Sequence, residues 1–329
     1  MSKGQNIHNP EQLIGKIQKD IESYTFRCLC QNCYDSAISS HSQQKEGQLR
    51  AIAKEGLVYA LNSNFFQHIK NLTHDNKMFL LRKAGVQEAS VFKGYCSFHD
   101  ELIFRPIEKP LLKPSDREQA ALLFLRAISY EYATKRKQVI IHRMLKNMIG
   151  DDSYVQSLSY LDTCAGGMEL YLKREGPFLL NQIFNILTKR DYGRFHTSWV
   201  RHPHKLPISV TTSVCPWVND YSSRWSPDNP QAVVSFSVIP SDNYTDIVCS
   251  WLNYCHDDSM WIQEEMKSIE GLEKIINLFG ISESEDFCIN IDFWESLEED
   301  KKQKVIFNMH HSVHKGPTVD VAMIIKLKN

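Results

Sequence analysis

Three cysteines lie close together near the start of this sequence, and a cysteine and a histidine lie close together much further on. Cys28, Cys30 and Cys33 fall within six residues, and Cys96 precedes His99 by three. Zinc is usually held by four cysteine or histidine ligands, commonly in two close pairs that tight turns can present. Cys33 with either Cys28 or Cys30 therefore predicts one pair, and Cys96 with His99 predicts the other.

The spacing also predicts the elements that position these ligands. If residues 96–104 open a helix, Cys96 and His99 fall on one face of its first turn. A turn that carries one pair, followed by a helix start that carries the other, is the treble-clef arrangement. The 62 residues between Cys33 and Cys96 would then be looped out as an insertion. The alternative is that some of these thiols are simply buried, as free cysteines commonly are.

The composition indicates a soluble globular protein. The chain has 329 residues, of which 42% are hydrophobic and 23% charged, enough for two or three domains. It contains no apolar run long enough to span a membrane, and its polar start has no signal-peptide core. We expect a cytoplasmic protein without membrane association, in which clustered cysteines hold metal rather than form disulfides.

The charge is unevenly distributed along the chain. Residues 1–150 carry 22 lysines and arginines against 14 acidic residues, although the whole chain has a net charge of −1. A basic surface suits binding to phosphates, so this half predicts contact with nucleic acid; the alternative is a scatter of solvated lysines. The predicted contacts are four residues in one helical stretch: Lys135, Arg136, Lys137 and Arg143. A protein partner or a homo-oligomer stays open.

The pattern along the chain predicts an α+β protein in three parts. Residues 1–114 would form the zinc module with its insertion, residues 115–190 a helical segment, and residues 191–329 an α+β domain with a mainly antiparallel sheet. Three prolines predict a linker or extended arm over residues 105–115, because proline cannot continue a helix and restricts the residue before it.

Local signals place the helices and strands. Ser115 and Glu118 match a capping box that would start a helix running to about residue 148. A second helical stretch, residues 153–189, would break at its glycine pair and at Pro177. The histidines of residues 194–207 are interpreted as a loop or surface cluster. Runs rich in β-branched residues predict strands within residues 205–214, 232–240, 246–254, 287–294 and 320–328.

The first half of the chain resembles the zinc-stabilised HNH endonucleases. It is most similar to a set of uncharacterised bacterial proteins with the pattern C-x4-C, AI-x-SH and GFC-x-x-HD-x-x-LF. Here these elements are Cys28 to Cys33, AISSH at residues 37–41, and GYCSFHDELIF at residues 94–104. The resemblance covers roughly residues 25–150, and it implies that the wider pair, Cys28 and Cys33, binds the zinc.

The resemblance also implies a reaction, the hydrolysis of phosphodiesters with one divalent ion. His41 would activate water as general base, and Asp100 would hold Mg²⁺ or Mn²⁺. This sequence departs from the family at two positions. Ser40 stands where an acidic metal ligand is usual, and the family's central asparagine is matched only by rough position, at Asn62 or Asn64.

Two functions are therefore predicted. The first is a metal-dependent nuclease or a degenerate relative, which by analogy would suit bacterial defence against phage. The second is a non-catalytic zinc-stabilised scaffold or sensor, whose C-terminal domain binds a protein partner or a small ligand. In that case His41 would only brace the zinc fold or serve as a zinc ligand.

Overall fold

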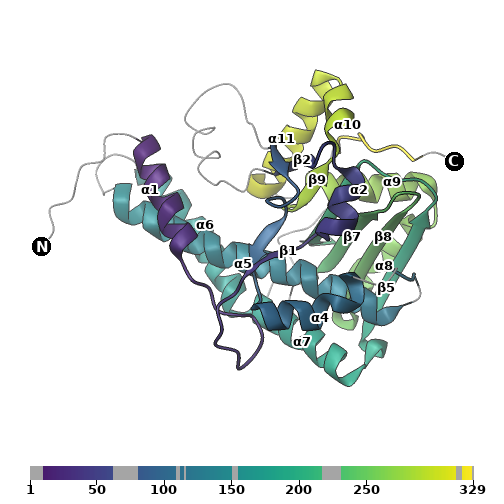
Figure 1. The fold of residues 1–329 in the computed structure, drawn as a ribbon, viewed down its shortest axis with the longest axis horizontal. Coiled ribbons are helices and arrows are strands. Elements are labelled where there is room, and N and C mark those ends of the chain that lie inside the picture. Colours follow the sequence, from purple (N-terminus) through teal and green to yellow (C-terminus); the bar gives the residue numbers. More distant parts are fainter. Residues whose placement is uncertain are drawn as a thin grey trace, which may run out of the picture.

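The computed structural model describes residues 10–61, 81–108, 112–114, 116–149, 155–216, 231–315 and 321–327. Helices combine with antiparallel sheet, which confirms the predicted α+β class. Figure 1 shows the arrangement: a sheet-containing body, and a helical arm formed by α1 and α6 at the end of the long helix α5.

The elements that surround the sequence motifs lie in the first third of the chain. They are α1 (Pro10–Ser23), β1 (Ser39–His41), a π-helical turn η1 (Lys45–Leu49), α2 (Arg50–Ile52), β2 (Leu57–Leu61), β3 (Leu81–Gly85), β4 (Val91–Lys93) and α4 (Ser97–Glu108).

The later elements form the central helices and most of the sheet. They are α5 (Arg117–Ile149), α6 (Val155–Lys173), α7 (Glu175–Lys189), η2 (Tyr192–Arg194), β5 (Phe195–His202), β6 (Ile208–Val214), β7 (Val234–Pro240), β8 (Thr245–Leu252), η3 (Asn253–Cys255), α8 (His256–Glu265), α9 (Ile269–Asn277), η4 (Leu278–Ser282), β9 (Phe287–Ile289), α10 (Ile291–Ser296) and α11 (Glu299–Lys315).

A seven-stranded sheet joins distant parts of the chain. Its strand order is β3-β2-β9-β6-β7-β8-β5, and every neighbouring pair is antiparallel. The short strand β9 lies in the middle, where Ile289 pairs with Tyr59 on one side and with Ile208 on the other. Strands of the predicted first and third parts thus share one sheet, and the proposed boundaries at residues 114 and 190 stay predictions.

The two faces of this sheet are covered by different elements. Successive side chains of a strand point to opposite faces. On β6, Ser213 donates a hydrogen bond to Glu131 of α5, whereas Val210 contacts the η4 turn near Gly280. Helix α5 therefore packs on one face and η4 on the other, and buried residues of α4, α5 and the sheet belong to one continuous core.

A separate two-stranded ribbon carries the motif residues. β1 and β4 pair antiparallel, with Ser39 opposite Lys93 and His41 opposite Val91. The residues between these strands contribute β2 and β3 to the large sheet, so the predicted insertion is in part sheet. Its stretch at residues 62–80, with Asn62 and Asn64, lies outside the described residues.

The start of α5 differs from the predicted capping box. Asp116 is the residue before the helix, and its Oδ1 accepts a hydrogen bond from the Gln119 backbone N–H at 3.0 Å. Ser115 lies outside the described residues. A neighbouring aspartate satisfies the same free N–H groups as serine, which explains the shift by one position. Helix α4 also continues through Pro106, so the expected linker begins later.

The predicted helix break lies elsewhere. α6 runs through its glycine pair to Lys173, and the change of helix occurs at Arg174. Pro177 sits in the first turn of α7, where its missing N–H leaves no helical hydrogen bond unmade. The prediction that Pro177 would interrupt a helix was therefore wrong.

Two strand predictions also need correction. Residues 321–327 form no strand; the Asn277 side chain accepts hydrogen bonds from the N–H groups of Ile324 and Ile325, both at 2.9 Å. An apolar β-branched run thus packs against α9 without pairing as a strand. Conversely, the histidine-containing stretch at residues 194–207 includes strand β5, which pairs along its whole length with β8.

Candidate metal centre and histidine site

A tight turn in the backbone presents the first two cysteines. The Cys28 N–H donates to the Asp35 carbonyl at 2.9 Å, and the Cys33 N–H donates to the Cys30 carbonyl at 3.2 Å. Asn32 adopts the left-handed conformation that such a turn requires, with φ of 59°. The Leu29 N–H donates to the Gly94 carbonyl at 2.8 Å, which ties the turn to the chain just before α4.

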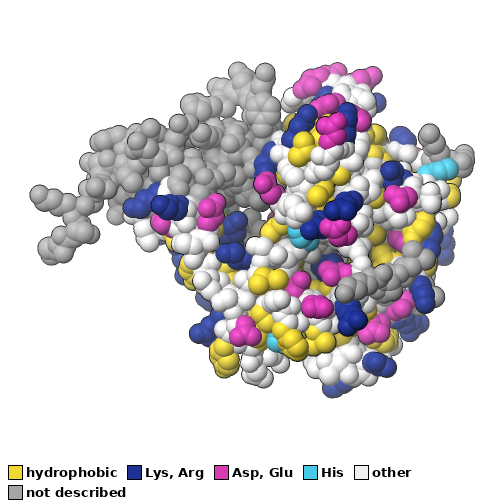
Figure 2. All heavy atoms as spheres, viewed as in Figure 1, with side chains coloured by type: hydrophobic (Ala, Val, Ile, Leu, Met, Phe, Trp, Pro, Cys, Tyr) yellow, Lys and Arg dark blue, Asp and Glu magenta, His cyan; other side chains and the backbone are white. Residues whose placement is uncertain are grey.

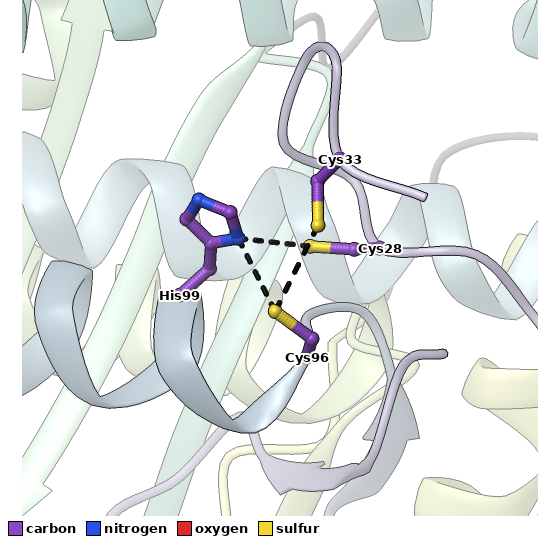
Figure 3. Close-up of side chains that lie close together, drawn as sticks. All are labelled: Cys28, Cys33, Cys96 and His99. Atoms are coloured by element: carbon purple, nitrogen blue, oxygen red, sulfur yellow. Dashed lines mark hydrogen bonds between the residues drawn. The ribbon is translucent and has the colours of Figure 1, made fainter. Parts of the chain in front are cut away.

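The start of α4 presents the other two side chains. Cys96 comes directly before the helix and His99 lies in its first turn, so their side chains are neighbours on one face. The Asp100 N–H donates to the Cys96 carbonyl at 2.9 Å, the first helical bond that fixes this spacing. Figure 3 shows the two side chains of α4 converging on Cys28 and Cys33 of the turn.

The distances between these side chains fit a tetrahedral metal ion. His99 Nδ1 lies 3.5 Å from Cys28 Sγ and 3.2 Å from Cys96 Sγ, and Cys33 Sγ lies 3.9 Å from Cys96 Sγ. Zinc bonds of about 2.3 Å to sulfur and about 2.0 Å to nitrogen place tetrahedral ligands roughly 3.5–3.8 Å apart. All four ligand atoms lie within 4.8 Å of one another, so the group could hold a metal ion such as zinc.

The geometry excludes a disulfide between Cys33 and Cys96. Bonded sulfurs are about 2 Å apart, whereas these two lie 3.9 Å apart. Cys30 stays outside the group, so Cys28 is the partner of Cys33 and the wider pair is the one present. Burial and the neighbouring Cys28 thiol raise the pKa of Cys30 to about 12, which keeps it a neutral thiol beside the ligands.

Cysteines of the four-ligand group have pKa values that differ from that of an isolated cysteine. The His99 backbone N–H lowers the pKa of Cys96, because a hydrogen bond to the sulfur favours the thiolate. At Cys33 the Asp35 backbone N–H acts in the same direction, but burial and the nearby Cys28 and Cys96 thiols raise the pKa to about 11. A metal ion would supply the positive charge that stabilises the other cysteines of the group as thiolates.

His41 ends strand β1 and has a fixed orientation. Its Nδ1 lies 3.0 Å from the Ala89 carbonyl oxygen. A carbonyl can only accept, so Nδ1 carries the proton of the neutral ring and Nε2 keeps its lone pair. Burial is the largest cause that lowers the pKa of His41, and Lys45 and Arg126 lower it further. The ring is therefore neutral at neutral pH, with Nε2 able to take a proton.

Asp100 and Ser40 lie beside His41. Burial raises the pKa of Asp100, while Ser40, Arg126 and His41 partly oppose this effect. The Ser40 hydroxyl is buried and has no hydrogen-bond partner of normal geometry among the described residues, but it lies close enough to the carboxylate to lower this pKa. His41 and Asp100, the two residues predicted to be catalytic, are thus near enough for each to affect the pKa of the other, and Ser40 lies near the Asp100 carboxylate.

An arginine that the sequence did not single out lies next to this pair. Arg126 of α5 is 2% exposed, donates to Glu108 Oε1 at 2.7 Å, and lies over the Phe104 ring at 4.3 Å. Its charge lowers the pKa values of both His41 and Asp100. The available signal was one charged residue inside the apolar run ALLFLRAIS, which helical periodicity alone does not explain.

Three of the four predicted nucleic-acid contacts on α5 have partners within the protein. Lys135 pairs with Glu131 at 2.8 Å, and Arg143 pairs with Glu169 at 2.6 Å. Arg136 donates to the carbonyls of Arg27 and Lys93, which braces the metal-site turn and the ribbon, and Lys137 is exposed. Figure 2 shows acidic and basic side chains interspersed over the visible face. Nucleic-acid binding by these residues stays a prediction.

Comparisons with protein-family models, with curated proteins and with solved structures found no match to this chain. Within the described ranges, no helix combines the length and apolar character needed to cross a membrane.

Proposed function

We propose that this chain is a zinc-stabilised nuclease of the HNH type, which hydrolyses phosphodiesters in nucleic acid with one divalent ion. The single observation that carries the proposal is the orientation of His41, whose Nδ1 is held by the Ala89 carbonyl, with the Asp100 carboxylate near enough for its charge to affect the pKa of the histidine. The order of elements supports it: a cysteine turn, the ribbon of β1 and β4, and α4 follow the treble-clef order that the resemblance implies.

The proposed role of His41 is that of general base. A base must be neutral, and its free nitrogen must face the attacking water. Burial lowers the pKa of His41, and the bond from Nδ1 to the Ala89 carbonyl leaves Nε2 unprotonated. The Ala89 carbonyl thereby orients the histidine, a task that the resemblance assigns to an asparagine.

The proposed role of Asp100 is to hold the divalent ion. Mg²⁺ is often bound through one or two carboxylates together with substrate phosphate oxygens, and it neutralises charge that develops on the phosphate. Asp100 supplies one carboxylate, and Ser40 supplies only a hydroxyl where the family has an acid. The second nearby carboxylate, Glu108, is paired with Arg126. We therefore expect weak ion binding without substrate.

A cleavage assay with matched controls tests the proposal. Plasmid DNA and RNA would be incubated with Mg²⁺ or Mn²⁺ and with wild type, His41→Ala or Asp100→Ala. Loss of a general base costs about 100-fold or more, so both variants should lose cleavage. The controls are His204→Ala, at an exposed histidine, and Glu101→Ala, at the exposed neighbour of Asp100 on α4. Equal cleavage by wild type and His41→Ala, or none by any protein, contradicts the proposal.

A non-catalytic zinc-stabilised scaffold is the second candidate, and one observation favours it. Large apolar side chains are exposed on the metal-binding segment: Tyr34 is 76%, Phe98 67% and Leu102 60% exposed. Phe98 and Leu102 are four residues apart, so they share one face of α4, and Figure 2 shows hydrophobic side chains exposed over this helix. Exposed apolar groups are typical of protein contacts. A role in phage defence stays a prediction from the resemblance.

A further inference from the structure

A buried carboxylate from the C-terminal half lies directly behind the His41 strand. Asp286 precedes β9 and is 4% exposed. Its backbone carbonyl accepts a hydrogen bond from the Thr211 N–H of β6 at 3.2 Å, which ties it to the middle of the large sheet. A buried carboxylate is costly unless several hydrogen bonds satisfy it, so its partners indicate what it is for.

Among the described residues, the side chains that donate to this carboxylate come from the segments that flank the ribbon strands. The Ser42 and Ser90 hydroxyls both donate to Oδ2, the latter at 3.0 Å, and the Gln43 side-chain amide donates to Oδ1 at 3.1 Å. These three donors offset part of the cost of burying the carboxylate.

Two of these donors come directly after His41 and Ala89, the two residues joined by the hydrogen bond that orients the histidine ring. Ser42 comes next after His41, and Ser90 comes next after Ala89, whose carbonyl binds the histidine Nδ1. The Ser42 N–H also donates to the Ser90 carbonyl at 2.9 Å. One carboxylate thus joins both sides of the hydrogen bond that fixes the ring.

We propose that Asp286 is a positioning residue for His41, through which the C-terminal sheet holds the candidate general base in its reactive tautomer. The proposal rests on the nuclease function only for its effect on turnover, since the effect on the histidine ring follows from the geometry alone. Burial raises the pKa of Asp286 to about 7, and Ser42, Ser90 and Gln43 oppose this shift, consistent with hydrogen bonds that the carboxylate needs.

The direct test observes the His41 ring, whether or not the protein cleaves nucleic acid. Nitrogen-15 NMR distinguishes a ring protonated at Nδ1 from one protonated at Nε2, and the His41→Gln variant assigns the signal. Wild type should show a single Nδ1–H tautomer. In Asp286→Ala, and to a smaller extent in Ser42→Ala, the signal should become that of a mixture. Zinc content and circular dichroism should remain those of wild type.

A matched control separates positioning from general loosening of the sheet. Ser235 is a buried serine of β7, two strands away from β9 in the sheet, and its hydroxyl lies near the Ser250 carbonyl rather than Asp286. Ser235→Ala should keep the wild-type ring signal. If Asp286→Ala does not fold, Ser42→Ala decides. An unchanged tautomer in the folded Asp286 or Ser42 variant overturns the proposal, and so does an equal change in Ser235→Ala.

The kinetic readout applies if the cleavage assay detects turnover. A misplaced general base lowers kcat while leaving KM nearly unchanged, so Ser42→Ala should lower kcat by about tenfold. An effect on KM alone would contradict positioning of the base. Absence of cleavage in wild type would refute the nuclease proposal but would leave the NMR result, and the inference about Asp286, intact.

Discussion

Replacing Cys28 by serine should weaken metal binding, whereas the same change at Cys30 should not. The two cysteines are separated by one residue, and spacing alone did not distinguish them, although the resemblance favoured Cys28. In the structure the Cys28 sulfur lies 3.5 Å from His99 Nδ1 and belongs to the four-ligand group, from which Cys30 is absent. Cys28→Ser and Cys30→Ser therefore form a matched pair with one distinguishing property, coordination.

The size of the effect follows from the number of ligands. Structural zinc in four-ligand modules contributes roughly 10–16 kcal/mol, so an equal share for one ligand is about 3 kcal/mol. A serine hydroxyl recovers little of this, because it stays protonated at neutral pH. A loss of about 3 kcal/mol corresponds to affinity weakened by roughly 150-fold.

Competition with a chromophoric chelator measures this difference. The chelator concentration that removes half of the zinc should fall by about 100-fold for Cys28→Ser and should change by less than about threefold for Cys30→Ser. Far-UV circular dichroism confirms that both variants fold, which we expect because α4 and α5 share the main core. Equal zinc loss in both variants, or wild-type retention in Cys28→Ser, would refute the ligand assignment.

Two further predictions concern stability. Arg136→Met should lower the free energy of unfolding, measured by urea denaturation, by about 2–4 kcal/mol. The reason is that the guanidinium donates to two backbone carbonyls and lies 4.7 Å from the Phe26 ring. As a control, Arg143→Met should lower this free energy by less than about 1 kcal/mol, because the Arg143 side chain is 64% exposed in its ion pair. Asp286 has a raised folded-state pKa of about 7, so the native state holds a proton that the unfolded chain has lost above about pH 4. Stability should fall as pH rises from about 4 to about 7 and then level off, and Asp286→Asn should reduce that slope relative to wild type.

The metal centre was largely predictable because its information is local. Cysteine and histidine pairs at short spacing belong to one turn and one helix start, which sequence patterns describe well. The choice between Cys28 and Cys30 was not local, since it depends on which sulfur the turn directs toward His99. Position within the turn, rather than residue type, made that choice.

The histidine site was only half predictable. The residue types and the motifs identified His41 and Asp100 in the sequence. The groups that orient them and shift their pKa values come from elsewhere in the chain. Ala89 is 48 residues from His41, and Asp286 is 244 residues from Ser42. A backbone carbonyl carries no residue-type signal, and a lone aspartate before a strand looks like any turn residue.

The strand errors have a physical cause as well. Residues 320–328 have the apolar pattern of a strand, but in the described part the Asn277 side chain binds the N–H groups that a neighbouring strand would bind. The histidines and polar residues of β5 do not have the apolar pattern that predicts a strand, yet the segment pairs along its whole length with β8. Strand identity depends on the available partner, which a pattern along one segment does not contain.

The ribbon strand that ends at His41 is held from two sides, by the large sheet and by the metal centre. In the segment between β1 and β4, strand β2 pairs with β9 in a register that places Tyr59 opposite Ile289. A shift of this register by one residue would turn every side chain of β2 to the opposite face of the sheet. The metal centre holds the other end of the ribbon, because the Ile38 N–H, just before β1, donates to the carbonyl of Tyr95, the residue before Cys96. His41 lies between these two restraints. Removing zinc and substituting Asp286 should therefore both disturb the Nδ1 bond to Ala89, from opposite directions and without touching the ring.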